Sequence, residues 1–107
     1  DQPATFTFVP TGTDRADTDT RHFRVKVEWR GGDRWVITHW NNLWNGKEWE
    51  YEPLGSSQDN AFRSRTGFTR DKACALAQQL ADTVEVEDLP WPDWEARRDA
   101  ARTAAGK

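Results

Sequence analysis

Seven tryptophans in a chain of 107 residues are the feature that most constrains its fold. Five of them fall in one stretch of 21 residues, from Trp29 to Trp49, and Trp91 and Trp94 enclose a Pro-Asp pair. Burying one Trp removes roughly 150–250 Å² from water, an upper limit of roughly 4–6 kcal/mol in transfer free energy. Because only 36% of the residues are hydrophobic, the core needs several of these rings. Trp is also enriched in binding hot spots, so each ring belongs either to the core or to a recognition surface.

Residues 22–30 (HFRVKVEWR) alternate between apolar and charged side chains, which is typical of a half-buried strand. The Gly32-Asp33 pair that follows suits a two-residue type II′ turn, which would place Trp29 opposite Val36. A three-residue loop would instead place Trp29 opposite Trp35 and turn the second strand over, so that its two faces exchange places.

A second turn decides between these two registers. Asn45-Gly46 is typical of a type I′ hairpin, which would pair Asn42 with Trp49 and Trp40 with Tyr51. Only the two-residue first turn then gathers the aromatic residues on one face, and we choose that register. The predicted inner face consists of Phe23, Val25, Val27, Trp29, Val36, Trp40, Trp49 and Tyr51. The outer face then holds, among charged residues, Trp35, Ile37 and His39.

One amphipathic helix is expected to cover the inner face. Thr69 is placed to cap a helix that runs to about Thr83, and its apolar stripe consists of Ala73, Leu76, Ala77, Leu80 and Val84. Shorter strands are predicted at 5–9 and near 84–86, a long polar connection at 53–67, and a weak helix capped by Asp93 up to about Ala105. The fold class is therefore α+β: a three- to four-stranded antiparallel β-meander with one α-helix packed on one face and a C-terminal arm or short helix.

The length predicts a single domain over residues 1–107, with a folded core at 5–89 and a C-terminal arm or helix at 90–107. The net charge of −3 provides no general attraction to nucleic acid or to an anionic membrane. Cys74 is the single cysteine, which excludes an intramolecular disulfide. No apolar run of about 18 residues is present, so no membrane-spanning segment is expected.

The sequence offers little chemistry for catalysis. Both histidines, His22 and His39, alternate within predicted strands, and Cys74 lies in mid-helix beside the apolar stripe, where a structural cysteine is usual. No phosphate-binding loop, nucleophile elbow or metal-ligand spacing is present. A calcium loop is not expected from the spacing of Asp14, Asp17 and Asp19. We therefore expect no enzyme activity, no metal site and no cofactor.

The remaining aromatic and basic residues predict a binding surface. The candidate residues are Trp35, Trp44, Arg63, Arg65, Trp91 and Trp94. Trp and Arg are enriched in the hot spots of protein interfaces, so the first hypothesis is a protein partner. The alternative is a single-stranded nucleic acid, because a sheet face with basic and stacking side chains is typical of single-strand binders. The C-terminal arm either folds back over the outer face or leaves some of these rings exposed.

A resemblance to known proteins rests on the run Trp49-Glu50-Tyr51-Glu52-Pro53, followed by Ser56-Ser57, Phe62, Arg65 and Phe68 and then by an Ala-rich helix. On these residues the chain resembles small uncharacterised proteins of actinobacteria and their phages. The similarity covers about residues 22–86 and brings no assigned activity. It implies a cytoplasmic accessory protein, encoded by a phage or mobile element, that binds and modulates a host or phage protein.

Overall fold

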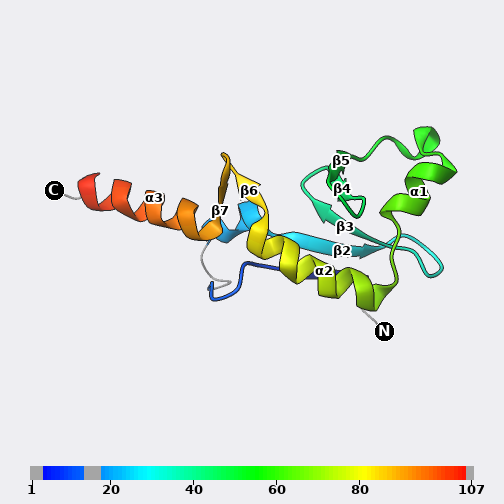
Figure 1. Cartoon of the computed structure of the whole chain (residues 1–107), viewed down its shortest axis with the longest axis horizontal. Helices are drawn as coiled ribbons and strands as arrows, with labels where there is room; N and C mark the ends of the chain where they lie inside the picture. The colour runs from blue at the N-terminus through cyan, green and yellow to red at the C-terminus, as the bar shows by residue number, and fades with distance from the viewer. Residues whose placement is uncertain (1–3, 14–17, 106–107) are drawn as a thin grey trace.

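The structure, a computed structural model, describes residues 4–13 and 18–105. Its centre is a five-stranded antiparallel sheet in which the strands follow one another in chain order (Figure 1). The strands are β1 (Thr5–Phe8), β2 (Val25–Trp29), β3 (Trp35–His39), β4 (Asn42–Trp44) and β5 (Trp49–Tyr51). The α+β meander is confirmed, with five strands where the sequence predicted three to four.

The predicted register of the first hairpin is wrong. Trp29 faces Trp35 rather than Val36, so the loop holds three residues, 31–33, and β3 is turned over. Gly31 and Gly32 both have a positive φ, which two consecutive glycines adopt without steric cost, and this allows the longer loop. Ile37 consequently lies in the main core, whereas Trp29 is half-exposed at 50%.

A tight turn at residues 40–41 accounts for the additional strand. His39 pairs directly with Asn42, and Trp40 adopts a left-handed conformation with φ of 56°. The next hairpin also differs from the prediction, because Trp44 rather than Asn42 faces Trp49. The Asn45 side-chain carbonyl accepts hydrogen bonds from the backbone N–H groups of Lys47 and Glu48. These bonds stabilise a longer turn than that of a type I′ hairpin.

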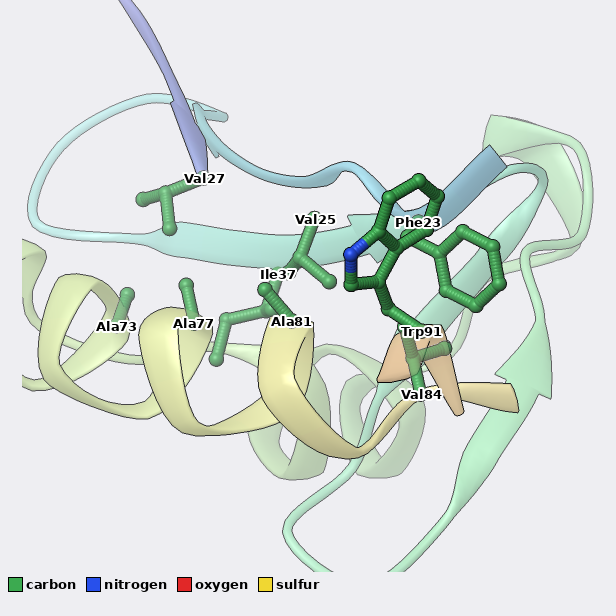
Figure 2. Close-up of a cluster of buried hydrophobic side chains, with 9 residues drawn as sticks. All are labelled: Phe23, Val25, Val27, Ile37, Ala73, Ala77, Ala81, Val84 and Trp91. Carbon is green, nitrogen blue, oxygen red and sulfur yellow. The ribbon is translucent and has the colours of Figure 1, made fainter. Parts of the chain in front are cut away.

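Helix α2 (Arg70–Thr83) covers one face of the sheet and begins as predicted, with Thr69 as its N-cap. Its buried residues are the three alanines Ala73, Ala77 and Ala81. Figure 2 shows them directed at the side chains of β2 and β3, namely Val25, Val27 and Ile37. Small helix residues let the helix lie close to the sheet. The predicted burial of Trp29 and Trp40 beneath Leu76 and Leu80 is wrong, and Trp49 is only partly buried.

The opposite face is partly covered by a short helix that the sequence analysis missed. Helix α1 (Asn60–Thr66) lies in the predicted polar connection, after a single 3₁₀ turn, η2 (Gly55–Ser57). The Asp59 carboxylate caps it by accepting a hydrogen bond from the Phe62 backbone N–H. Phe62 packs with Val36 and Leu43 in a second, smaller core.

The C-terminal segment lies at one end of the sheet and not over its outer face. It consists of the strand pair β6 (Glu85–Val86) and β7 (Leu89–Pro90) and helix α3 (Trp91–Ala105). Trp91 and Trp94 meet Phe23 edge-on, at the end of the 3₁₀ segment η1 (Thr18–Phe23). From there α3 extends away from the sheet along the longest axis of the molecule (Figure 1). Within the described ranges, no helix combines the length and apolar character that crossing a membrane requires.

Candidate functional site

The six residues predicted to form a binding surface do not lie together. Trp35 is on the α2 side, not on the uncovered face as predicted, where it contacts Phe6 at 5.8 Å between ring centroids. Trp44 packs edge-on against Trp49 beside the same core. Trp91 is only 3% exposed, and the partly buried Trp94 stacks on it. The four rings serve mainly as packing groups in this structure.

The two predicted arginines lie on α1. Arg65 binds the Glu50 carboxylate through Nη2 at 2.7 Å and Nε at 2.8 Å, which ties α1 to β5. These hydrogen bonds, together with one from Asn45, lower the pKa of Glu50 to about 2. Arg63 is exposed, and its backbone carbonyl accepts a hydrogen bond from Arg34.

A different surface has the composition of a binding site. A hollow of about 510 Å³ lies on the face of the sheet that α2 does not cover. We call it the basic hollow, and it is lined by Arg21, Arg24, Lys26, Glu28, Arg30, Thr38, His39, Trp40, Asn41, Tyr51 and Glu52. Its volume falls within the range of roughly 300–1,000 Å³ that is usual for ligand pockets.

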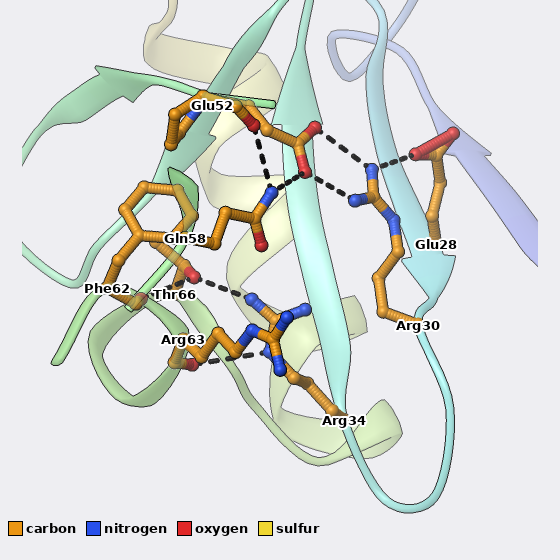
Figure 3. Close-up of polar contacts among 9 residues, drawn as sticks. Glu28, Arg30, Arg34, Glu52, Gln58, Phe62, Arg63 and Thr66 are labelled. Carbon is orange, nitrogen blue, oxygen red and sulfur yellow. Dashed lines mark hydrogen bonds and ion pairs between the residues drawn. The ribbon is translucent and has the colours of Figure 1, made fainter. Parts of the chain in front are cut away.

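The two carboxylates of the basic hollow are engaged by one arginine. Figure 3 shows Arg30 between Glu28 and Glu52, with ion pairs to both. Gln58 donates a further hydrogen bond to Glu52. The hydrogen bonds from Arg30 lower the pKa of Glu52 despite its partial burial, and the same contacts raise the pKa of Arg30. The Glu52 carboxylate is therefore negatively charged at neutral pH, and Arg30 compensates both carboxylates in part.

Three cations of the basic hollow are available to bind a ligand. Among the described residues, no hydrogen bond or ion pair engages the side chains of Arg21, Arg24 and Lys26. Arg24 directly precedes β2, Lys26 is the second residue of that strand, and Arg21 comes from η1. Four cations, counting Arg30, line the hollow with two carboxylates, so this part of an acidic protein has a local excess of positive charge.

Two exposed aromatic rings border the same hollow. Trp40 is 64% exposed and Tyr51 is 70% exposed. One side of the Trp40 ring stacks on His22 at 5.8 Å, and His39 meets it edge-on. The position of His39 is fixed by a contact of 2.8 Å between its Nε2 and the His22 carbonyl, and burial lowers its pKa. Contacts with the two histidines thus hold the Trp40 ring in place, while much of its surface is exposed to solvent.

The described part of the chain contains no group of three or more His, Cys, Asp or Glu side chains placed to hold a metal ion. Asp14 and Asp17 lie outside the described residues. Cys74 is partly buried on α2, and desolvation raises the pKa of its thiol, so the thiol is protonated at neutral pH.

Sequence reasoning missed the basic hollow because it assigned Trp40 and Tyr51 to the core. A signal was present in the Asn41-Asn42 pair, since two polar, turn-forming residues interrupt an otherwise strand-like segment directly after Trp40. A turn at that point exposes the ring that precedes it.

Comparison with known proteins found no match to this chain among family models, curated proteins or solved structures.

Proposed function

We propose that the protein is a non-catalytic binding module and that the basic hollow is where it holds its partner. The observation that supports this proposal is the combination, in one hollow, of two exposed aromatic rings with three cations that have no partner in the described residues. Trp, Tyr and Arg are the residue types that dominate binding hot spots.

The sequence alone favours a protein as the partner, with the chain acting as an accessory protein of an actinobacterial phage in the host cytoplasm. The basic hollow favours the alternative, a single-stranded nucleic acid, because its cations outnumber its carboxylates. In both cases the six residues first predicted for the surface give way to Trp40, Tyr51, Arg21, Arg24 and Lys26.

The test is affinity capture from an actinobacterial lysate, with mass spectrometry and nucleic-acid staining of the bound material. Trp40→Ala is expected to lose the captured partner while retaining the native circular dichroism spectrum. The matched control is Trp29→Ala, which removes another half-exposed Trp that does not line the hollow. If Trp40→Ala and a combined Arg24→Gln, Lys26→Gln variant both capture the same partner as the wild type, the function does not depend on the basic hollow and the proposal fails.

A further inference from the structure

We infer that the ligand of the basic hollow is a single-stranded nucleic acid, with phosphates on the cations of β2 and η1 and a base on Trp40. This inference rests on the proposed function, because it names the partner of the same site. Two features of the hollow support it independently: the arrangement of its cations and the state of its exposed tryptophan.

Three cations line the same hollow, as contacts to successive phosphates of one strand require. Arg24 directly precedes β2 and Lys26 lies within it, about 7 Å apart at the backbone because two extended residues span that distance. Arg21 of η1 lines the same hollow. A groove of unpaired cations that tracks the backbone is one of the two components of single-strand binding sites.

The second component of such sites is an aromatic platform for bases. The Trp40 ring stacks on His22 on one side, which fixes its position, and the residue is still 64% exposed to solvent. Its left-handed backbone, with φ of 56°, is unfavourable for a bulky residue, and such conformations concentrate at functional sites. Tyr51 adds a second exposed ring at the rim of the hollow.

The combination favours an unpaired strand over an acidic peptide or a duplex. A run of acidic residues would engage the cations but brings no aromatic ring to stack on Trp40. A duplex offers its phosphates but keeps its bases stacked on one another. Only a single strand supplies phosphates and free base faces together, which matches both halves of the hollow.

The test is fluorescence anisotropy of the whole chain with a labelled oligothymidylate of about 12 nucleotides, a length within the usual site sizes. Binding is expected to weaken as salt is raised, because phosphate contacts release counterions. Lys26→Gln is expected to reduce the slope of log K against log salt by about 0.7, the value for one phosphate contact on a single strand. The control is Lys47→Gln, which removes another exposed lysine, at the tip of the β4–β5 hairpin, and is expected to leave the slope unchanged.

The stacking component is tested separately from charge. Trp40→Ala is expected to weaken oligothymidylate binding about tenfold or more while leaving the salt slope unchanged, since it removes a stacking surface and no cation. A duplex of the same length is expected to bind more weakly than the single strand. An oligouridylate of equal length shows whether RNA and DNA are held alike, and binding of either strand supports the inference.

Several outcomes would overturn the inference. These are no oligonucleotide binding even at low salt, equal binding of duplex and single strand, unchanged affinity of Trp40→Ala, and displacement of the strand by polyglutamate of matched charge at equal concentration. If the oligonucleotides fail while nuclease-treated lysate still yields a protein that requires Trp40, the ligand class is wrong and the proposed function stands. If neither an oligonucleotide nor a lysate component depends on Trp40 or Lys26, both fail.

Discussion

The two faces of the sheet are covered in different ways, and this contrast separates the packed core from the surface that we propose as the binding site. One face is covered by α2, whose three buried alanines meet Val25, Val27 and Ile37. The other face is divided. Helix α1 covers the small cluster of Val36, Leu43 and Phe62, and the basic hollow occupies a separate area where charged side chains of β2 meet the β3–β4 turn.

This difference follows from the side chains that each face of β2 and β3 presents. The α2 side of β2 carries valines that a helix can bury without leaving a polar group unsatisfied. The other side carries Arg24, Lys26, Glu28 and Arg30, which a covering element could bury only at the cost of desolvating charge. A strand with one apolar and one charged face therefore yields a packed side and an open side.

The largest effect is expected from Phe23→Ala, which removes a fully buried ring that joins the α2 core to Trp91 and Trp94. The free energy of unfolding should fall by about 3–5 kcal/mol, the usual cost of deleting a buried Phe side chain. Denaturant unfolding followed by circular dichroism measures it. Trp29→Ala is the comparison, and it should cost clearly less because that ring is half-exposed. Equal losses of unfolding free energy in the two variants would mean that the half-exposed Trp29 contributes as much to the core as the buried Phe23.

An intermediate effect is expected in the smaller core. Leu43→Ala should lower the free energy of unfolding by about 2–3 kcal/mol, near the lower end for buried leucines, because α1 can move to fill part of the space. Leu54→Ala is the matched control, since that Leu is 80% exposed and should cost almost nothing. A Leu43→Ala variant as stable as the control would show that the α1 side contributes no packing energy.

Trp40→Asn should separate stability from binding. A left-handed residue other than Gly, Asn or Asp costs roughly 1–2 kcal/mol, and Asn relieves much of this strain. Lost ring contacts with His22 and His39 offset part of the gain, so the free energy of unfolding should stay constant or rise by up to about 1 kcal/mol. The same variant should lose its partner. Trp29→Asn, which changes a residue without a positive φ, should show no such gain. A loss of stability above about 1 kcal/mol would make Trp40 a structural residue.

The sequence predicted the elements better than their pairing. The Thr69 cap and the apolar stripe predict both ends of α2, its start after Thr69 and its end at Thr83. This prediction succeeds because capping and helical periodicity act locally. The hairpin registers depend on which of two turns is lower in energy, and Gly31-Gly32 permits both. The choice rested on the assumption that aromatic rings gather on one face. The main core instead consists largely of valines, Ile37 and alanines, and its buried rings are those of Phe23 and Trp91.

The same assumption explains why the six residues predicted for a binding surface do not lie together. Trp35 was assigned to a surface by strand parity, and a shift of one residue in the first turn exchanges the two faces. The charged face of β2, in contrast, was identified correctly, since alternation within a single strand does not depend on register. The basic hollow can therefore be recognised only when the charged face of β2 is considered together with the turn at residues 40–41.

The smallest expected effect concerns the link that holds α1 on the open side, the Arg65–Glu50 ion pair. Its hydrogen bonds keep the pKa of Glu50 at about 2, against an ordinary value of 4.5. Between these values the unfolded chain binds a proton that the folded chain does not, so the pair's contribution is present above about pH 4.5 and is lost as the pH falls toward 2.

Arg65→Gln should therefore make unfolding less dependent on pH between 4.5 and 2, measured by denaturant titration at several pH values. His39, whose pKa burial lowers, adds a loss of stability below its ordinary value of 6.5 that both proteins share, so only their difference in the acidic range reports on Glu50. Arg97→Gln, which breaks the exposed pair with Glu87, serves as control and should follow the wild type. If Arg65→Gln also follows the wild type throughout, Phe62 packing and the Arg34 hydrogen bonds to Arg63 and Thr66 are sufficient to hold α1 on the sheet, and the Arg65–Glu50 pair is dispensable for the fold.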